Sequence, residues 1–143
     1  MRTHHPALAQ PRVADAGKLV LRVTIGLLLL LHGLFKLIHG VDGIAGMLQK
    51  AGLPGVLAYA VYVGEVLAPL LLIAGLWTRA AGLVVVANML VAIGLAHGSQ
   101  ILTLGEQGGW ALELQGLYLF GAVAVALLGA GRYSVGGVDG RFN

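Results

Sequence analysis

Cysteine and charge are what this sequence most clearly lacks. There is no cysteine among the 143 residues, which excludes disulfides, thiolate nucleophiles, iron–sulfur ligation and covalently attached c-type haem. Only 10% of the residues are charged, whereas a soluble domain carries roughly 25%. Together with a hydrophobic content of 58%, this composition indicates an integral membrane protein with little room for a separate soluble domain.

Four apolar runs are each close to the roughly 20 residues that cross a bilayer. They predict helices at about 19–38, 56–76, 80–96 and 111–130. The first run is too long for the apolar core of a cleaved signal peptide, so we expect it to remain as a span. The predicted fold is an all-α integral membrane protein, a four-transmembrane-helix bundle over residues 18–131. A flexible tail (1–17) precedes this bundle and a basic tail (132–143) follows it.

A short amphipathic pattern follows the first run. Apolar residues recur there at helical spacing, and Asp42 is placed to cap a helix that "GLPG" (52–55) ends. The residues on the apolar side are Ile44, Met47, Leu48 and Ala51. We therefore predict a short amphipathic helix at the membrane interface, between helices 1 and 2.

Basic residues set the expected topology. With four spans, one side of the membrane holds seven of them and the other side holds two, Lys36 and Lys50. The seven are Arg2, Arg12, Lys18, Arg22, Arg79, Arg132 and Arg141. This asymmetry predicts that both termini are cytoplasmic. Because these basic residues cluster at helix ends, the net charge of +3 does not indicate nucleic-acid binding.

Small residues recur at helical spacing and predict close helix contacts. In the first helix the stripe is Arg22, Gly26, Leu29, Gly33 and Lys36. In the fourth it is Gly121, Ala122, Val125 and Gly129.

Glu65 lies near the middle of the second apolar run, where an unpaired carboxylate costs several kcal/mol. Three interpretations are open. It pairs with His32 or Lys36 and joins two helices, it is protonated in an apolar site, or it takes part in proton or ligand chemistry. Pro69 should kink this helix and free the carbonyl of residue 65.

Other polar residues gather in the same outer half of the predicted bundle. His32, Lys36 and His39 share one face of the first helix, and Asn88 and His97 lie on the third. Nothing in the spacing requires haem b between His39 and His97, so we do not predict it. A metal site from His32, His39, His97 and Glu113 is conceivable, but the sequence assigns no metal ligand.

These segments resemble the DoxX family. The similarity is carried by "LRVTIGLLLLLHGLFKL" (21–37), "GLPGVLAYAVYVGEVLAPLLLIAGLWTRAAGL" (52–83), "NMLVAIGLAHG" (88–98) and "GAGRYSVGGVD" (129–139). The family pattern maps onto Arg22, Gly26, His32, Gly33, Lys36, Glu65, Gly75, Arg79, His97, Gly131, Arg132 and Ser134. One departure is that "VGGV" separates Ser134 from the acid Asp139, which the family usually places closer.

The resemblance implies a four-helix protein of the bacterial cytoplasmic membrane that is linked to redox work. Some members resemble the membrane subunit of a thiosulfate:quinone oxidoreductase. The candidate catalytic residues are then Glu65 and His32, exchanging protons with quinone oxygens, and Lys36 would stabilise the reduced anion. Asn88 and His97 complete the candidate cofactor-binding set. No residue here carries electrons alone, so a soluble or membrane redox partner, or a bound cofactor, would have to carry them.

Two other functions remain open. In the first, the protein is a structural or assembly anchor for a soluble enzyme, and Glu65 only joins helices. In the second, it is a small transporter that works as a homo-oligomer, because four helices leave little space for a path.

Overall fold

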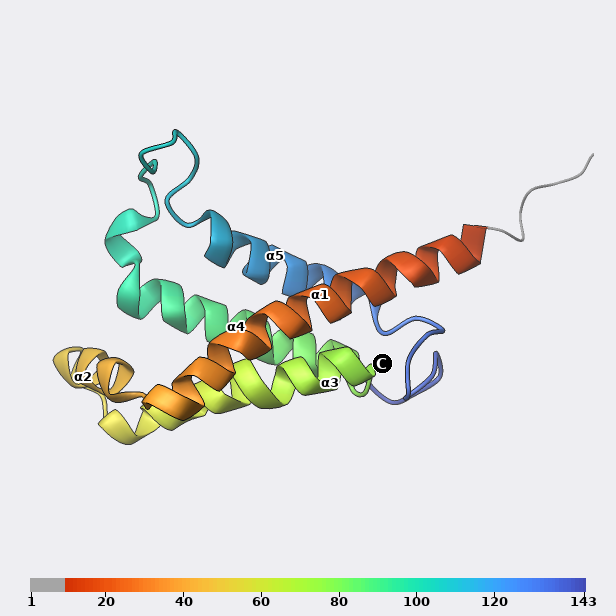
Figure 1. Ribbon diagram of the computed structural model, residues 1–143, viewed down its shortest axis with the longest axis horizontal. Coiled ribbons are helices and arrows are strands. Elements are labelled where there is room, and N and C mark those ends of the chain that lie inside the picture. The colour runs from red at the N-terminus through yellow and green to blue at the C-terminus, as the bar shows by residue number, and fades with distance from the viewer. Residues whose placement is uncertain (1–9) are drawn as a thin grey trace, which may run out of the picture.

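The first helix, α1 (Gln10–His39), runs the length of the bundle in the computed structural model, which describes residues 10–143 (Figure 1). Residues 10–17, which the sequence predicts as part of a flexible tail, are helical. Asp15 and Lys18, three residues apart, form an ion pair at 3.7 Å that supports this first part of the helix. The rest of the predicted tail, with Arg2, His4 and His5, lies outside the described residues.

The predicted amphipathic helix is present as α2 (Asp42–Lys50). Asp42 is its first residue rather than its cap, and no side chain caps the helix. Leu48 is buried with Val41 and Ala58 in a small apolar cluster at the end of the bundle where α1 finishes. The helix is therefore attached to the bundle through its apolar side, as its pattern predicts.

The second apolar run is a composite of several helix types rather than one kinked α-helix. It contains the 3₁₀ segment η1 (Gly55–Ala60), the π-helical segment η2 (Val63–Leu67) and α3 (Ala68–Ala74). The wide π segment ends two residues before Pro69, which has no N–H to bond the carbonyl of Glu65. The run ends at Gly75, whose φ of +72° lies in the left-handed region that favours glycine.

Helices α4 (Thr78–Ala96) and α5 (Glu113–Leu128) form an antiparallel hairpin. A short 3₁₀ turn, η3 (Gly98–Gln100), and a loop join them. At 16 residues, α5 is about 24 Å long, shorter than the roughly 30 Å hydrocarbon core.

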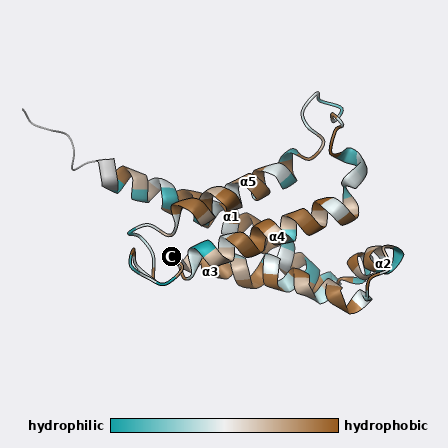
Figure 2. Cartoon of the chain, turned by 180° about the vertical axis from the view of Figure 1, so that it is seen from behind, coloured by the Kyte–Doolittle hydropathy of each residue, from teal (hydrophilic) through white to brown (hydrophobic). Residues whose placement is uncertain are grey.

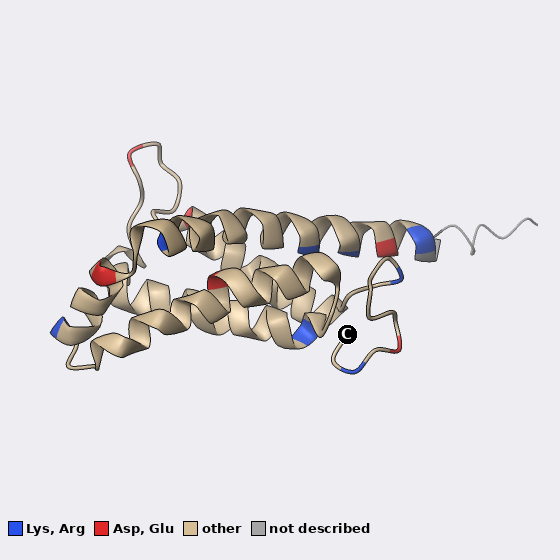
Figure 3. Cartoon of the chain, turned by 60° about the horizontal axis from the view of Figure 1, so that its bottom comes forward, with Lys and Arg blue, Asp and Glu red and all other residues tan. Residues whose placement is uncertain are grey.

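Within the described residues, three helical segments are long and apolar enough to cross a membrane: Arg12–His39, Gly55–Ala74 and Thr78–Ala96. Helix α5 is a shorter apolar helix, so a count of four spans stays a prediction. Apolar residues dominate the helices, and charged residues gather mainly toward the two ends of the bundle (Figures 2 and 3).

The core lies where α1 and α5 meet α3 and α4, and both small-residue stripes face it. Arg22, Gly26, Leu29 and Gly33 are buried along α1. In α5 the buried positions include Ala122 and Val125. The seams predicted from small residues are therefore the contacts that the bundle uses.

The predicted basic tail is folded against the bundle at the end where Gly75 lies, which we call the Gly75 end. The N–H groups of Val135 and Gly136 donate to the carbonyls of Ala74 and Gly75 at 3.0 and 3.1 Å. The Asn143 side chain accepts from the backbone N–H of Thr78 at 3.1 Å. These bonds satisfy polar backbone groups that the ends of α3 and α4 leave open.

Arg22 is the buried charge of the Gly75 end, with 1% of its surface exposed. Its guanidinium donates to the carbonyls of Leu72 and Ile73 at 2.6 and 2.7 Å, and also to those of Ala130 and Tyr133. The last carbonyls of a helix carry partial negative charge, so the end of α3 compensates the buried cation.

Candidate functional site

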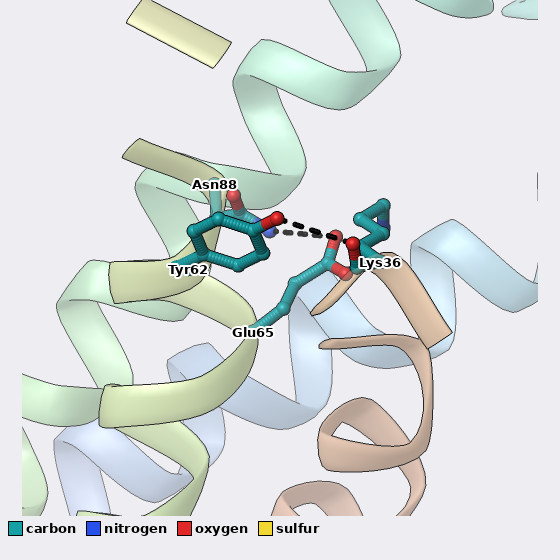
Figure 4. Close-up of polar contacts among 4 residues, drawn as sticks. All are labelled: Lys36, Tyr62, Glu65 and Asn88. Atoms are coloured by element: carbon teal, nitrogen blue, oxygen red, sulfur yellow. Dashed lines mark hydrogen bonds and ion pairs between the residues drawn. The ribbon is translucent and has the colours of Figure 1, made fainter. Parts of the chain in front are cut away.

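Glu65 lies at the opposite half of the bundle, toward the end where α1 finishes, which we call the His39 end. Its side chain is buried, with 5% of the residue exposed. One carboxylate oxygen is paired with Nζ of Lys36 from α1. The other accepts a long hydrogen bond of 3.4 Å from Nδ2 of Asn88 on α4. Figure 4 shows these side chains converging from three segments. Of the three interpretations of Glu65, the structure supports pairing, and the partner is Lys36 rather than His32.

Two glycines let these groups come together. A Cβ on Gly33 would lie 2.1 Å from the carbonyl oxygen of Glu65, so the backbones of α1 and η2 are in direct contact at this point. A Cβ on Gly64 would lie 2.4 Å from Cγ of Asn88. Both positions need glycine for close approach, and the carbonyl of Glu65, which lies in η2, is the group nearest to Gly33.

Tyr62 is a member of this site that sequence analysis missed. Its hydroxyl donates to the backbone carbonyl of Lys36 at 3.1 Å and so joins the second span to the last turn of α1. Its position three residues before Glu65, on the same helix side, was the available signal.

A cavity of about 750 Å³ opens beside the ion pair, between α2, η1, η2 and α4. Lys36, Glu65 and Asn88 are the polar groups at one part of its wall, and His97 lies near the His39 end. Most of the remaining lining is apolar, including Met47, Leu48, Leu57, Val61, Ala87, Val91, Ala92 and Leu95. Ligand pockets are typically of this size, largely apolar with a few placed polar groups.

The three histidines within residues 10–143 are held in separate places. His32 is exposed and its ring meets Tyr118 of α5 edge-on, with centroids 6.0 Å apart, so it does not line the cavity. His39 is stacked on Phe35 at the end of α1. His97 contacts Gln100 and Gln115 at 2.9 and 3.3 Å. Within the described residues, no three His, Asp or Glu side chains gather as they would around a metal ion, and Glu113 is exposed at the start of α5.

The charges of the site balance within a small volume. The Lys36 side chain is 25% exposed and that of Glu65 is 6% exposed, so the cation is the more accessible partner. Such a pair is weak evidence for stability, because desolvation offsets much of the attraction. Ionisable groups at membrane depth commonly mark ligand or proton pathways.

Comparison with known proteins agrees with this architecture. A protein of Bacillus subtilis (strain 168) described as "Putative oxidoreductase CatD" is 33% identical to the chain over 79 residues. The alignment covers 55% of this chain and 58% of that relative, so less than two thirds of its length is matched. No solved structure shows significant similarity to the chain. Residues 17–98, which include Lys36, Glu65, Asn88 and His97, match the sequence profile of DoxX. The chain is a helical membrane protein and belongs to the DoxX family.

Proposed function

We propose that this protein is the membrane component of a bacterial oxidoreductase system and binds a quinone headgroup in the cavity beside Lys36, Glu65 and Asn88. The observation that carries the proposal is the cavity itself, which is apolar except for a few polar residues that include a buried carboxylate. Family membership and the name of the Bacillus subtilis relative support the redox setting. We further propose that the membrane is the cytoplasmic one and that both termini face the cytoplasm.

The residues of the cavity fit a quinone. Its carbonyl oxygens need hydrogen-bond donors, which Lys36 Nζ and Asn88 Nδ2 supply. Its ring and isoprenoid chain need an apolar surface, which α2, η1 and α4 provide. The pocket has room for a ligand of this class.

Each polar residue has a separate task. When bound, a quinone supplies the electron-accepting chemistry, with electrons delivered by a partner redox protein. Lys36, the more accessible member of the pair, would donate to an oxygen of the ligand and would stabilise negative charge there. Glu65 holds and passes a proton, and Asn88 keeps the carboxylate oriented. The apolar walls exclude water, which strengthens these interactions.

Titration of the purified protein with a short-chain ubiquinone and a short-chain menaquinone tests this proposal. Ala92 lines the cavity and Leu90, on the same helix, is exposed outside it. We expect Ala92→Phe to weaken binding at least about tenfold, because the new ring fills the ligand's space, and Leu90→Phe to leave it unchanged. Equal affinity in both variants, or no binding by the wild type, would remove the proposal.

A structural function is the second candidate, and the ion pair itself favours it. Lys36 and Glu65 join α1 to η2, which is what an anchor for a soluble enzyme would need. The variant Glu65→Gln separates the two functions. Loss of quinone binding in a folded protein supports the cavity proposal, whereas loss of the folded protein together with intact binding in the surviving fraction supports the anchor.

A further inference from the structure

The motif "GAGRYSVGGVD" (129–139) lies at the Gly75 end, away from the quinone cavity, and has no part in the proposed function. Its first turn is fixed from within and from the bundle. The hydroxyl of Ser134 donates to the carbonyl of Gly131 at 2.7 Å, and Arg22 donates to two further carbonyls of the turn. Gly131 has a φ of +73°, in the left-handed region that favours glycine. The backbone around Arg132 is therefore held in place, while its own side chain is exposed.

Arg132 lines a pocket of about 550 Å³ together with the stretch 136–140, which we call the Arg132 pocket. Three residues of that stretch are glycines, so backbone forms much of the wall. Asp139 is the acidic residue of the lining and Arg132 is the basic one, and both are exposed. Within residues 12–143, neither of them forms an ion pair. The pocket therefore holds two opposite charges that do not pair with each other.

Two opposite charges in one pocket are complementary to a ligand that itself carries both charges. A guanidinium binds phosphate through its planar set of N–H donors, so Arg132 suits the negative end of such a ligand. A carboxylate accepts hydrogen bonds from a primary ammonium group, so Asp139 suits the positive end. The ethanolamine phosphate group has this chemistry, with a phosphate and an ammonium a few bonds apart. The pocket volume lies within the range of small-molecule sites.

The surroundings of the Arg132 pocket indicate a lipid headgroup rather than a soluble molecule. Two helical segments of membrane-spanning length, Gly55–Ala74 and Thr78–Ala96, meet at the Gly75 end, so the pocket lies at the level of the headgroups. Trp77 is exposed between these segments, as aromatic residues commonly are at the membrane interface. Val138, which lines the pocket, and its neighbour Val135 are also exposed. They offer an apolar surface to the glycerol and first acyl carbons of a lipid.

We propose that the Arg132 pocket binds the headgroup of phosphatidylethanolamine, with the phosphate on Arg132 and the ammonium on Asp139. Basic residues outnumber acidic ones six to two at this end of the bundle, which attracts the phosphates of lipids in general (Figure 3). The eight are Arg12, Lys18, Arg22, Arg79, Arg132, Arg141, Asp15 and Asp139. Asp139 adds selection, because a lipid without a cationic group brings only negative charge toward it. Phosphatidylcholine is also disfavoured, since its quaternary ammonium has no N–H to donate.

Native mass spectrometry of the delipidated protein tests the site, with equal amounts of phosphatidylethanolamine, phosphatidylglycerol and phosphatidylcholine that carry the same acyl chains. We expect the wild type to retain phosphatidylethanolamine at least about threefold more than either other lipid. Arg132→Gln should lower its retention at least about tenfold, because a charged hydrogen bond to phosphate is lost. Asp139→Asn should still bind lipid but without the preference for phosphatidylethanolamine. A wild-type preference for phosphatidylglycerol, or an unchanged preference in Asp139→Asn, would overturn the proposal.

Matched controls make the same charge changes at the Gly75 end but outside the pocket. Arg141→Gln and Asp15→Asn should both keep the preference for phosphatidylethanolamine, and its loss in Asp15→Asn would refute the site by showing that net charge alone decides.

Free phosphoethanolamine separates a lipid headgroup from a soluble ligand of the same chemistry. We expect it not to displace the bound lipid, because it lacks the glycerol and acyl carbons that contact the apolar surface. Displacement at equal concentration would contradict a lipid site. Because no part of this experiment uses a quinone, its outcome is independent of the quinone titration.

Discussion

Gly33→Ala is the substitution that most directly tests how the bundle positions Glu65. The added Cβ would lie 2.1 Å from the carbonyl oxygen of Glu65 and 2.6 Å from its carbonyl carbon. Ordinary contact begins at 3.4 Å, so α1 and η2 must separate by 1.3 Å, the difference between 3.4 and 2.1. A backbone oxygen cannot rotate away as a side chain can, and the whole seam must therefore open.

Overpacking of this kind costs about 1–3 kcal/mol, and a backbone clash belongs at the upper end. Alanine regains up to about 1 kcal/mol because it favours a helix more than glycine does. The net expectation is a loss of about 2 kcal/mol in the free energy of unfolding. We also expect at least about tenfold weaker quinone binding, because Glu65 and Lys36 are moved apart.

The matched control is Gly17→Ala in the same helix, where an added Cβ meets nothing within 4 Å. That variant should be neutral or slightly stabilised. Denaturation in bicelles of fixed composition, followed by circular dichroism, compares the two. Equal stability of both variants would refute the close contact between Gly33 and Glu65 on which the site geometry depends.

Three further predictions concern the buried charges. Lys36→Met alone should destabilise the protein by up to about 3–5 kcal/mol in denaturation, because it leaves the Glu65 carboxylate unpaired, and should abolish quinone binding. Adding Glu65→Leu to Lys36→Met should restore most of the stability but none of the binding, and a double variant as unstable as the single one would contradict this. Arg22→Met should lower the free energy of unfolding, because Arg22 donates to four backbone carbonyls at the Gly75 end. The quinone affinity of the folded fraction should not change, since the cavity lies in the other half of the bundle. A changed affinity would contradict this and show that the two ends are coupled.

The sequence predicts that this is a helical membrane protein, and it predicts the approximate positions of the helices and the sides on which they pack. These features depend on apolar runs and on the spacing of small residues, both of which are local. The stripe from Arg22 to Gly33 is an example, since its spacing alone places it in the core.

The partner of Glu65 shows where such reasoning stops. His32 and Lys36 are one turn apart on α1, and periodicity does not decide which of them faces the second span. The π turn rotates Glu65 relative to a regular helix, and the long Lys36 side chain reaches it. Tyr62 was missed for a related reason, because its bond to the Lys36 carbonyl depends on how two helices cross.

The packing of the segment after α5 against the bundle was not predicted. Its glycines and charges are typical of a tail, yet it closes the Gly75 end through backbone bonds and through Arg22. Bonds between backbone groups far apart in the chain leave no side-chain pattern. The early start of α1 at Gln10 had a weak signal in the Asp15 and Lys18 spacing.

The most direct measurement of the central claim is native mass spectrometry of the protein gently extracted from its own membrane, in the wild type and in Ala92→Phe. The proposed function predicts a bound quinone mass on the wild type that is absent from the variant, while both carry lipid. A wild-type protein that carries lipid alone, or a quinone retained equally by both forms, would contradict a quinone site beside Lys36, Glu65 and Asn88.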